Sequence, residues 1–141
     1  MRLDSNDGRW RDIGLLILRV IVGIVFIAHG YMKYKMGIAG TTGFMTNIGV
    51  PLPSVAAPFS IAAEMGGGIA LILGILTLPV GLALTLDMIG AITFAKHWAE
   101  LVGPKGYELE ILLLAASLAL ALTGPGRFSL AASLGRGRFK S

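Results

Sequence analysis

Cysteine is absent from the 141 residues of the chain. Without thiols, the chain's own side chains cannot form disulfides, perform thiolate redox chemistry or build a Cys-based zinc site. Charge is scarce as well, since charged residues make up 14% of the sequence and hydrophobic residues 55%. Soluble domains carry about 25% charged residues. The composition therefore indicates an integral membrane protein, and the length favours a single domain over residues 1–141.

The few charges sum to a formal +4, and the basic residues gather in the two tails. Basic tails beside apolar segments are typical of membrane flanks that face anionic lipid. We therefore expect the lipid bilayer, and no nucleic acid, as a partner. The basic tail residues are Arg2, Arg9, Arg11, Arg127, Arg136, Arg138 and Lys140.

Four apolar segments predict an all-α, four-helix membrane bundle, because about 20 apolar residues in a helix cross a bilayer. The expected spans are 13–32, 55–78, 79–98 and 107–124, with a short turn at Thr77-Leu78-Pro79. A signal peptide is the alternative for the first segment. That segment is longer than a typical signal-peptide core, and no small-x-small cleavage site follows it.

The connection 33–54 contains a stretch that predicts a short interfacial helix, with Thr41 as its N-cap. Phe44, Met45 and Ile48 would share one side of this helix. The tail 125–141 is short, basic and contains Gly and Ser, so we expect it to be mobile or associated with lipid.

Four spans place both termini on one side of the membrane, together with seven Lys and Arg residues. The opposite side would carry four basic residues, namely Lys33, Lys35, Lys96 and Lys105. The positive-inside rule therefore predicts an inner-membrane protein with both termini in the cytoplasm.

Three charged residues fall inside the expected spans: Arg19, Glu64 and Asp87. Each costs about 2.5–3.5 kcal/mol at the bilayer centre, so we expect them to face the bundle interior. Similar depth favours an Arg19–Asp87 pair, although Arg19 could reach the deeper Glu64 instead. Their formal sum is one negative charge. The trio could be a structural clasp or a site for proton transfer or ligand anchoring, or Arg19 could snorkel to the cytoplasmic surface.

A second polar set lies at the non-cytoplasmic ends of the expected spans. Its dispersed spacing matches no metal motif, so no metal site is predicted. Imidazoles can exchange protons with a ring carbonyl, which makes this set a candidate quinone site walled by Tyr31, Phe94 and Trp98. Ordinary interfacial anchoring is the alternative. The polar residues are His29, Lys33, Lys96, His97, Glu108 and Glu110.

Glycines are placed where they would let helices approach closely. Gly66-Gly67-Gly68 lies in the middle of the second expected span, and Gly23 and Gly30 lie on the first. Glycine faces of this kind are typical of helix contacts in membranes, either within one bundle or between protomers.

These motifs resemble the DoxX family of small bacterial and archaeal membrane proteins. The resemblance rests on LRVIVGIVFIAHGYMK (18–33), AEMGGGIALILGILT (63–77), Lys96-His97, and ELEILLLAASLALALTGPGRFSL (108–130), which together cover most of the chain. It implies a four-helix membrane protein with a polar set inside. The family motif positions it implies are Arg19, His29, Lys33, Glu64, His97, Glu110 and Arg127.

The resemblance implies a redox setting, because the family takes its name from the small subunit of an archaeal thiosulfate:quinone oxidoreductase. Other members are linked to membrane assemblies that handle thiols and oxidative stress. The leading hypothesis is a redox-associated subunit that works with a quinone or a small thiol. In it, Arg19, Glu64 and Asp87 form the catalytic set, and His29, Lys33, His97 and Glu110 bind the cofactor. The alternatives are a non-catalytic anchor for soluble redox enzymes and a protein that binds small solutes or lipids. A homo-oligomer is also compatible with the sequence.

Overall fold

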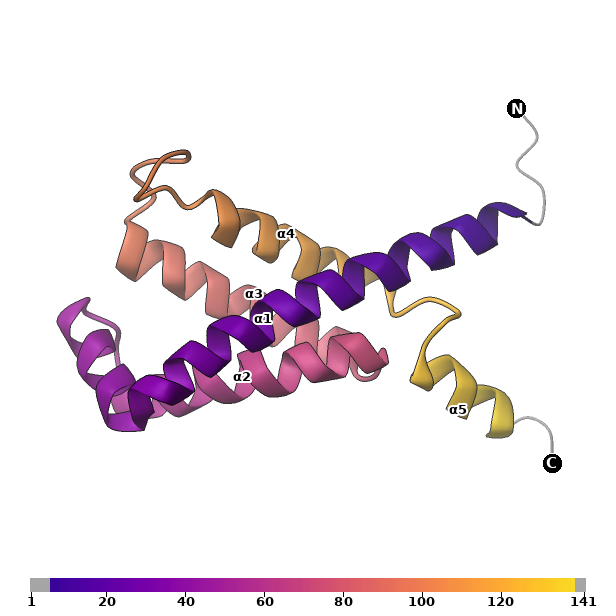
Figure 1. The fold of residues 1–141 in the computed structure, drawn as a ribbon, viewed down its shortest axis with the longest axis horizontal. Helices are drawn as coiled ribbons and strands as arrows, with labels where there is room; N and C mark the ends of the chain where they lie inside the picture. Colours follow the sequence, from indigo (N-terminus) through magenta and orange to yellow (C-terminus); the bar gives the residue numbers. More distant parts are fainter. Residues whose placement is uncertain (1–5, 139–141) are drawn as a thin grey trace.

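The computed structural model describes residues 6–138, and the regular elements in this range are all helices (Figure 1). The predicted all-α membrane fold is therefore confirmed. The elements are α1 (Asn6–Asn47), α2 (Pro53–Leu73), α3 (Thr77–Gly90), the π-helix η1 (Ala91–Lys96), α4 (Glu108–Thr123) and α5 (Leu130–Arg138).

Three helical segments in the described range are long and apolar enough to cross a membrane. They are Gly8–Asn47, Pro53–Leu73 and Thr77–Lys96. The fourth bundle helix, α4, has 16 residues. At about 1.5 Å per residue it is shorter than a hydrocarbon core of about 30 Å. It packs along α3, where Gly81 lies against Ser117 and Ala121.

The first helix is longer than predicted and has a kink at Gly37, where φ is 84° and ψ is 159°. Glycine adopts such a backbone conformation without steric cost. A short helix over 38–47 follows the kink, which confirms that the connection contains a helix, although its interfacial position stays a prediction. Thr41 does not cap this helix, because the helix begins directly after Gly37. Thr41 Oγ1 instead donates to the Lys33 carbonyl at 3.0 Å.

The short turn predicted between the second and third helices is present, but it lies at 74–76 and not at 77–79. Helix α2 ends at Leu73, and Gly74 (φ 73°) closes it by donating its N–H to the carbonyls of Ala70 and Leu71. Helix α3 begins at Thr77. Pro79 lies inside the first turn of α3, where its missing N–H is tolerated, which agrees with a third span that includes it from its start.

Glycines hold α1 and α2 at close range, as the sequence indicates. A Cβ atom at Gly23 would lie 2.6 Å from the Gly68 carbonyl oxygen, and a Cβ at Gly68 would lie 2.6 Å from that of Gly23. A Cβ at Gly30 would meet Met65 N at 2.9 Å and Glu64 Cβ at 3.0 Å. These contacts fix the register of the two antiparallel helices.

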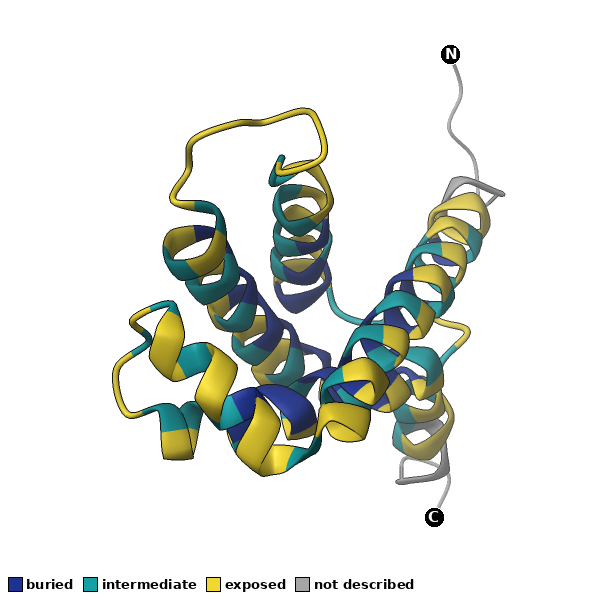
Figure 2. Cartoon of the chain, turned by 60° about the vertical axis from the view of Figure 1, so that its left-hand side comes forward, coloured by how far each residue is buried: buried dark blue, intermediate teal, exposed yellow. Residues whose placement is uncertain are grey.

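Both ends of the described chain lie at the same end of the bundle, together with the α2–α3 turn (Figure 1). The Arg127 backbone N–H donates to Asp12 Oδ1 at 3.1 Å, and the Ala131 N–H donates to the Gly74 carbonyl at 3.3 Å. The segment after α4 is therefore held to the bundle at these two points and continues into α5. Association of the tail with lipid stays a prediction, and its last residues, 139–141, lie outside the described range. Buried residues line the inward helix faces, and exposed ones cover the outside (Figure 2).

Candidate functional site

Arg19 is fully buried, and its guanidinium donates to backbone carbonyls from two segments. Nη1 donates to the Leu71 oxygen at 2.9 Å and to that of Ile72 at 3.2 Å, and Nη2 donates to the Phe128 oxygen at 2.5 Å. Leu71 and Ile72 belong to the last turn of α2, where carbonyls lack the usual N–H partner four residues further along the chain. The Leu71 oxygen also accepts the Gly74 N–H at 3.1 Å. The negative end of the helix dipole also favours a cation there. Arg19 therefore caps α2 and ties the segment after α4 to it.

The expected Arg19–Asp87 and Arg19–Glu64 pairs are wrong, because the register of the bundle places Arg19 beside the α2–α3 turn. Asp87 follows Thr77, the first residue of α3, by ten residues. At about 1.5 Å per residue it lies about 15 Å further into the bundle. Glu64 precedes Leu71 by seven residues on α2, a distance of about 10 Å. Full burial also excludes snorkelling by Arg19.

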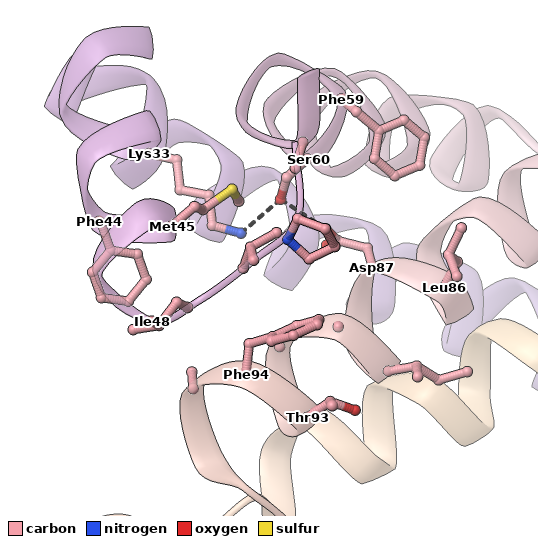
Figure 3. Close-up of a pocket in the computed structure, with 17 residues that line it drawn as sticks. Lys33, Phe44, Met45, Ile48, Phe59, Ser60, Leu86, Asp87, Thr93 and Phe94 are labelled. Carbon is pink, nitrogen blue, oxygen red and sulfur yellow. Dashed lines mark hydrogen bonds between the residues drawn. The ribbon is translucent and has the colours of Figure 1, made fainter. Parts of the chain in front are cut away.

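Lys33, rather than Arg19, is the cation that meets the buried carboxylate of Glu64. Its Nζ lies 2.5 Å from Glu64 Oε1 and donates to Ser60 Oγ at 2.9 Å. Ser60 Oγ in turn donates to Asp87 Oδ1 at 2.7 Å. These four residues, which we call the Lys33 cluster, join α1, α2 and α3 in one hydrogen-bonded chain. Figure 3 shows three of them, Lys33, Ser60 and Asp87, with the two bonds that connect them.

The local sequence explains how the Lys33 cluster assembles. Arg19, Phe26 and Lys33 are seven residues apart, so they share the face of α1 that packs into the bundle. Ser60 and Glu64 are four residues apart and share a face of α2. Gly30 lets α2 approach one turn before Lys33, which brings the ammonium within reach of Glu64.

Sequence reasoning placed Lys33 at the non-cytoplasmic end of the first span, apart from Glu64, because that span was ended at Met32, whereas the helix continues to the kink at Gly37. It missed Ser60 altogether. The signal that could have found Ser60 is its spacing of four residues from the buried Glu64.

A cavity of about 520 Å³ opens beside the Lys33 cluster, between the short helix after Gly37 and the α2, α3 and η1 segments (Figure 3). Its polar side chains are those of Lys33, Ser60, Asp87 and Thr93, and the rest of its lining is apolar or glycine. The predicted shared side of Phe44, Met45 and Ile48 is confirmed, since all three line this cavity. The remaining lining residues are Val50, Pro51, Ala56, Phe59, Leu86, Ile89, Gly90, Ala91, Phe94 and Ala95.

The predicted histidines lie elsewhere among the described residues. His29 is half-buried, and its Nδ1 lies 2.9 Å from the Val25 carbonyl of its own helix. His97 is exposed and follows η1 in a left-handed backbone conformation with φ 56°. Neither side chain lines the cavity. Their cofactor-binding role stays a prediction, and the structure does not bring the two histidines to the cavity beside Lys33.

Of the three aromatic residues expected to wall a quinone site, Phe94 lines the cavity. Trp98 packs edge-on against Tyr107 with ring centroids 5.5 Å apart, and its Nε1 donates to Thr93 Oγ1 at 3.1 Å. Tyr31 is exposed, and the Lys35 ammonium lies 5.7 Å from its ring centre.

The remaining predicted residues lie at the two ends of the bundle. Lys96 Nζ lies 4.0 Å from Glu110 Oε1, near the start of α4, outside the cavity lining. Glu108 and the side chain of Arg127 are exposed. Within residues 6–138, no group of three His, Asp or Glu side chains is arranged to hold a metal ion.

Comparison with known proteins identifies the family to which the chain belongs. The DoxX family model matches residues 14–98. The chain is 43% identical over 113 residues to the Bacillus subtilis protein named "Putative oxidoreductase CatD", covering 80% of this chain and 81% of that protein. It is 33% identical over 129 residues to the Escherichia coli inner membrane protein YphA, covering 87% and 91% of the two chains.

A third relative, the Escherichia coli inner membrane protein YqjF, is 34% identical over 120 residues, which cover 84% of this chain and 90% of that one. No solved structure matches the chain. The family match spans more than half of the chain and includes Arg19, Lys33, Glu64 and Asp87. The protein is therefore a member of the DoxX family of membrane proteins.

Proposed function

We propose that this protein is a membrane subunit of a redox system and that the cavity beside Lys33 is its quinone site. The observation that carries the proposal is the cavity itself, which is apolar on most sides and has convergent polar groups on one wall. Sites for small molecules commonly combine an apolar lining with a few oriented polar groups. A quinone fits this division, because its ring and tail are apolar and its carbonyl oxygens accept hydrogen bonds.

The polar wall suits a carbonyl acceptor. An ammonium group has three N–H donors, and Lys33 directs two of them to Ser60 and Glu64. The third donor is available to a ligand oxygen. The rings of Phe44, Phe59 and Phe94 line the rest of the cavity and would contact the ring or the tail.

The charge of the Lys33 cluster favours a neutral quinone over an anionic ligand such as a thiolate or a sulfur oxyanion. The Lys33 cluster has two carboxyl groups and one ammonium, so it has no surplus positive charge for an anion to neutralise, whether or not one carboxyl group is protonated. An anion such as thiosulfate or a thiolate would add negative charge to a site of low dielectric, which is unfavourable. A neutral quinone adds none.

Electrons in this proposal come from outside the chain. The sequence has no cysteine, so its side chains supply no dithiol couple. A soluble redox enzyme or a small thiol would therefore be the donor. The same absence favours a second candidate function, a membrane anchor that recruits soluble redox enzymes.

Quinone binding to the purified protein in lipid nanodiscs tests the site. Trp98 is bonded to Thr93 on the cavity wall, so its fluorescence should be quenched when ubiquinone-1 binds. Trp10→Phe removes the signal from the opposite end of α1. We expect saturable quenching that Lys33→Met weakens by about tenfold or more, because a hydrogen bond to a charged group contributes about 1.5–3 kcal/mol.

Lys35→Met is the matched control, since Lys35 is exposed and lies against Tyr31, outside the cavity lining. This variant should bind like the parent protein. Quenching that does not saturate, or that changes equally in both lysine variants, would rule out the site. Phe94→Ala provides a second variant that leaves the Lys33 cluster intact, and it should weaken binding by loss of apolar contact.

Turnover distinguishes the two candidate functions. Quinone reduction by the isolated chain with a dithiol donor supports a catalytic subunit. Activity that appears only with a co-purified soluble enzyme supports the anchor. Native mass spectrometry that finds a phospholipid, and no quinone, retained in a Lys33-dependent manner would instead support a lipid-binding protein.

A further inference from the structure

The Lys33 cluster contains more acid than base. Lys33 supplies one positive charge, whereas Glu64 and Asp87 supply two carboxyl groups. Glu64 is 1% exposed, and although Asp87 is half-buried, its Oδ2 atom is buried as well. Little water therefore reaches these carboxyl oxygens to stabilise an unbalanced charge. An ionised carboxylate buried without a partner is strongly unfavourable.

The hydrogen bonds also leave two oxygens free. Lys33 donates to Glu64 Oε1 and to Ser60, and the single Ser60 hydroxyl proton goes to Asp87 Oδ1. Among the described residues, the buried atoms Glu64 Oε2 and Asp87 Oδ2 have no hydrogen-bond partner. A carboxyl oxygen without a donor is the place where a proton can be held.

The other ionisable groups of the surrounding helices are held elsewhere in the described part of the chain. On α1, Arg19 is bonded to backbone carbonyls beside the α2–α3 turn, and His29 lies against the Val25 carbonyl. On η1, Lys96 faces Glu110 of α4. Lys33 is therefore the cation of this cluster, paired directly with Glu64 and connected to Asp87 through Ser60.

We propose that the Lys33 cluster is a proton-binding site in which Glu64 and Asp87 together hold one proton. The cluster is then neutral, with one ammonium, one carboxylate and one carboxylic acid. Asp87 lines the cavity and Glu64 lies outside its lining, and the two are connected through Ser60 and Lys33. The proton can therefore move between the buried Glu64 and Asp87, which lines the cavity. The inference does not depend on the identity of the cavity ligand.

Infrared spectroscopy of the protein in nanodiscs at neutral pH tests the proposal. A protonated carboxylic acid has a C=O stretch that is separate from the carboxylate bands and shifts in D2O. We expect this band in the parent protein. Because either amide substitution removes the surplus acid, the band should disappear both in Glu64→Gln and in Asp87→Asn.

Two controls make the assignment specific. Glu108→Gln replaces an exposed carboxylate and should keep the band. Glu110→Gln identifies any band that belongs to the Lys96 pair, since Glu110 Oε2 is also buried without a partner. A parent protein without the band, or a band that remains in either cluster variant, would overturn the proposal. The parent spectrum and one folded single variant are enough to decide.

Stability gives an independent measurement. Each single variant keeps one carboxylate for Lys33, so each should unfold within a few degrees of the parent protein. The double variant Glu64→Gln/Asp87→Asn leaves the ammonium without a counter-charge, and its loss should exceed the sum of the single losses. Strictly additive effects would contradict the shared proton.

Discussion

Arg19 contributes to stability through backbone atoms, because its guanidinium donates to three carbonyls, those of Leu71, Ile72 and Phe128. We expect Arg19→Leu to lower the free energy of unfolding by about 3 kcal/mol or more, since each hydrogen bond to a charged group contributes about 1.5–3 kcal/mol. Thermal unfolding in detergent, followed by circular dichroism, measures the change.

Arg9→Leu is the control for this prediction, because Arg9 is an exposed residue on the same helix. It should leave the unfolding temperature nearly unchanged. The unfolding temperature of Arg19→Lys should lie between those of Arg19→Leu and Arg9→Leu, because a lysine keeps the charge but lacks the planar guanidinium geometry. A stable Arg19→Leu protein would show that the three bonds contribute little.

Which residues are buried could be predicted from the sequence, but which ones pair could not. Arg19 and Glu64 stand out in apolar segments, and both are fully or almost fully buried. Their partners depend on how far each helix slides past the next. A shift of ten residues along α3 separates Asp87 from Arg19, and hydropathy carries no information on such a shift.

At the level of elements, the α1–α2 contact depends on the absence of side chains at three glycines. We expect Gly30→Ala to destabilise the protein by about 1–3 kcal/mol, because the new methyl group would press on Met65 and Glu64. The same displacement should lengthen the contact between Lys33 and Glu64. Unfolding by increasing amounts of a denaturing detergent measures the loss in the free energy of unfolding.

Gly14→Ala is the matched control on α1, since nothing lies within 4 Å of a Cβ atom at Gly14. It should be neutral or stabilise the helix by up to about 1 kcal/mol. If both glycine variants behaved alike, close approach of α2 would not be the reason for Gly30.

Element existence was easier to predict than element boundaries. The apolar segments predicted each bundle helix, yet α1 continues past Met32, and Gly37, not Thr41, sets the start of the short helix. A single glycine inside a helix is often tolerated, so its use as a break depends on what the next segment packs against. Here that segment forms one wall of the cavity.

At the scale of the whole molecule, the two ends of the described chain share one end of the bundle. We expect both to face the cytoplasm, because the basic residues gather there. The chain has no cysteine, so each introduced thiol is a unique reporter. Gly8→Cys and Ser133→Cys should react with a membrane-impermeant maleimide in inverted vesicles, and Ala99→Cys in intact spheroplasts.

All three positions are exposed, so access from water decides the labelling. Reaction of residues 8 and 133 from opposite sides of the membrane would contradict the topology of the bundle. Reaction of both from outside the cell would keep the bundle and reverse its orientation.

The contacts of Arg19 also bear on the order in which the protein is made. The Phe128 carbonyl that Arg19 binds is 109 residues further along the chain. At about 5–20 residues per second, the ribosome needs about 5–20 s to bring it out after Arg19. The first helix must therefore enter the lipid while its guanidinium still lacks its final partners. The segment that contains Phe128 is made after the bundle helices, and it completes the burial of a charge that entered the membrane with the first of them.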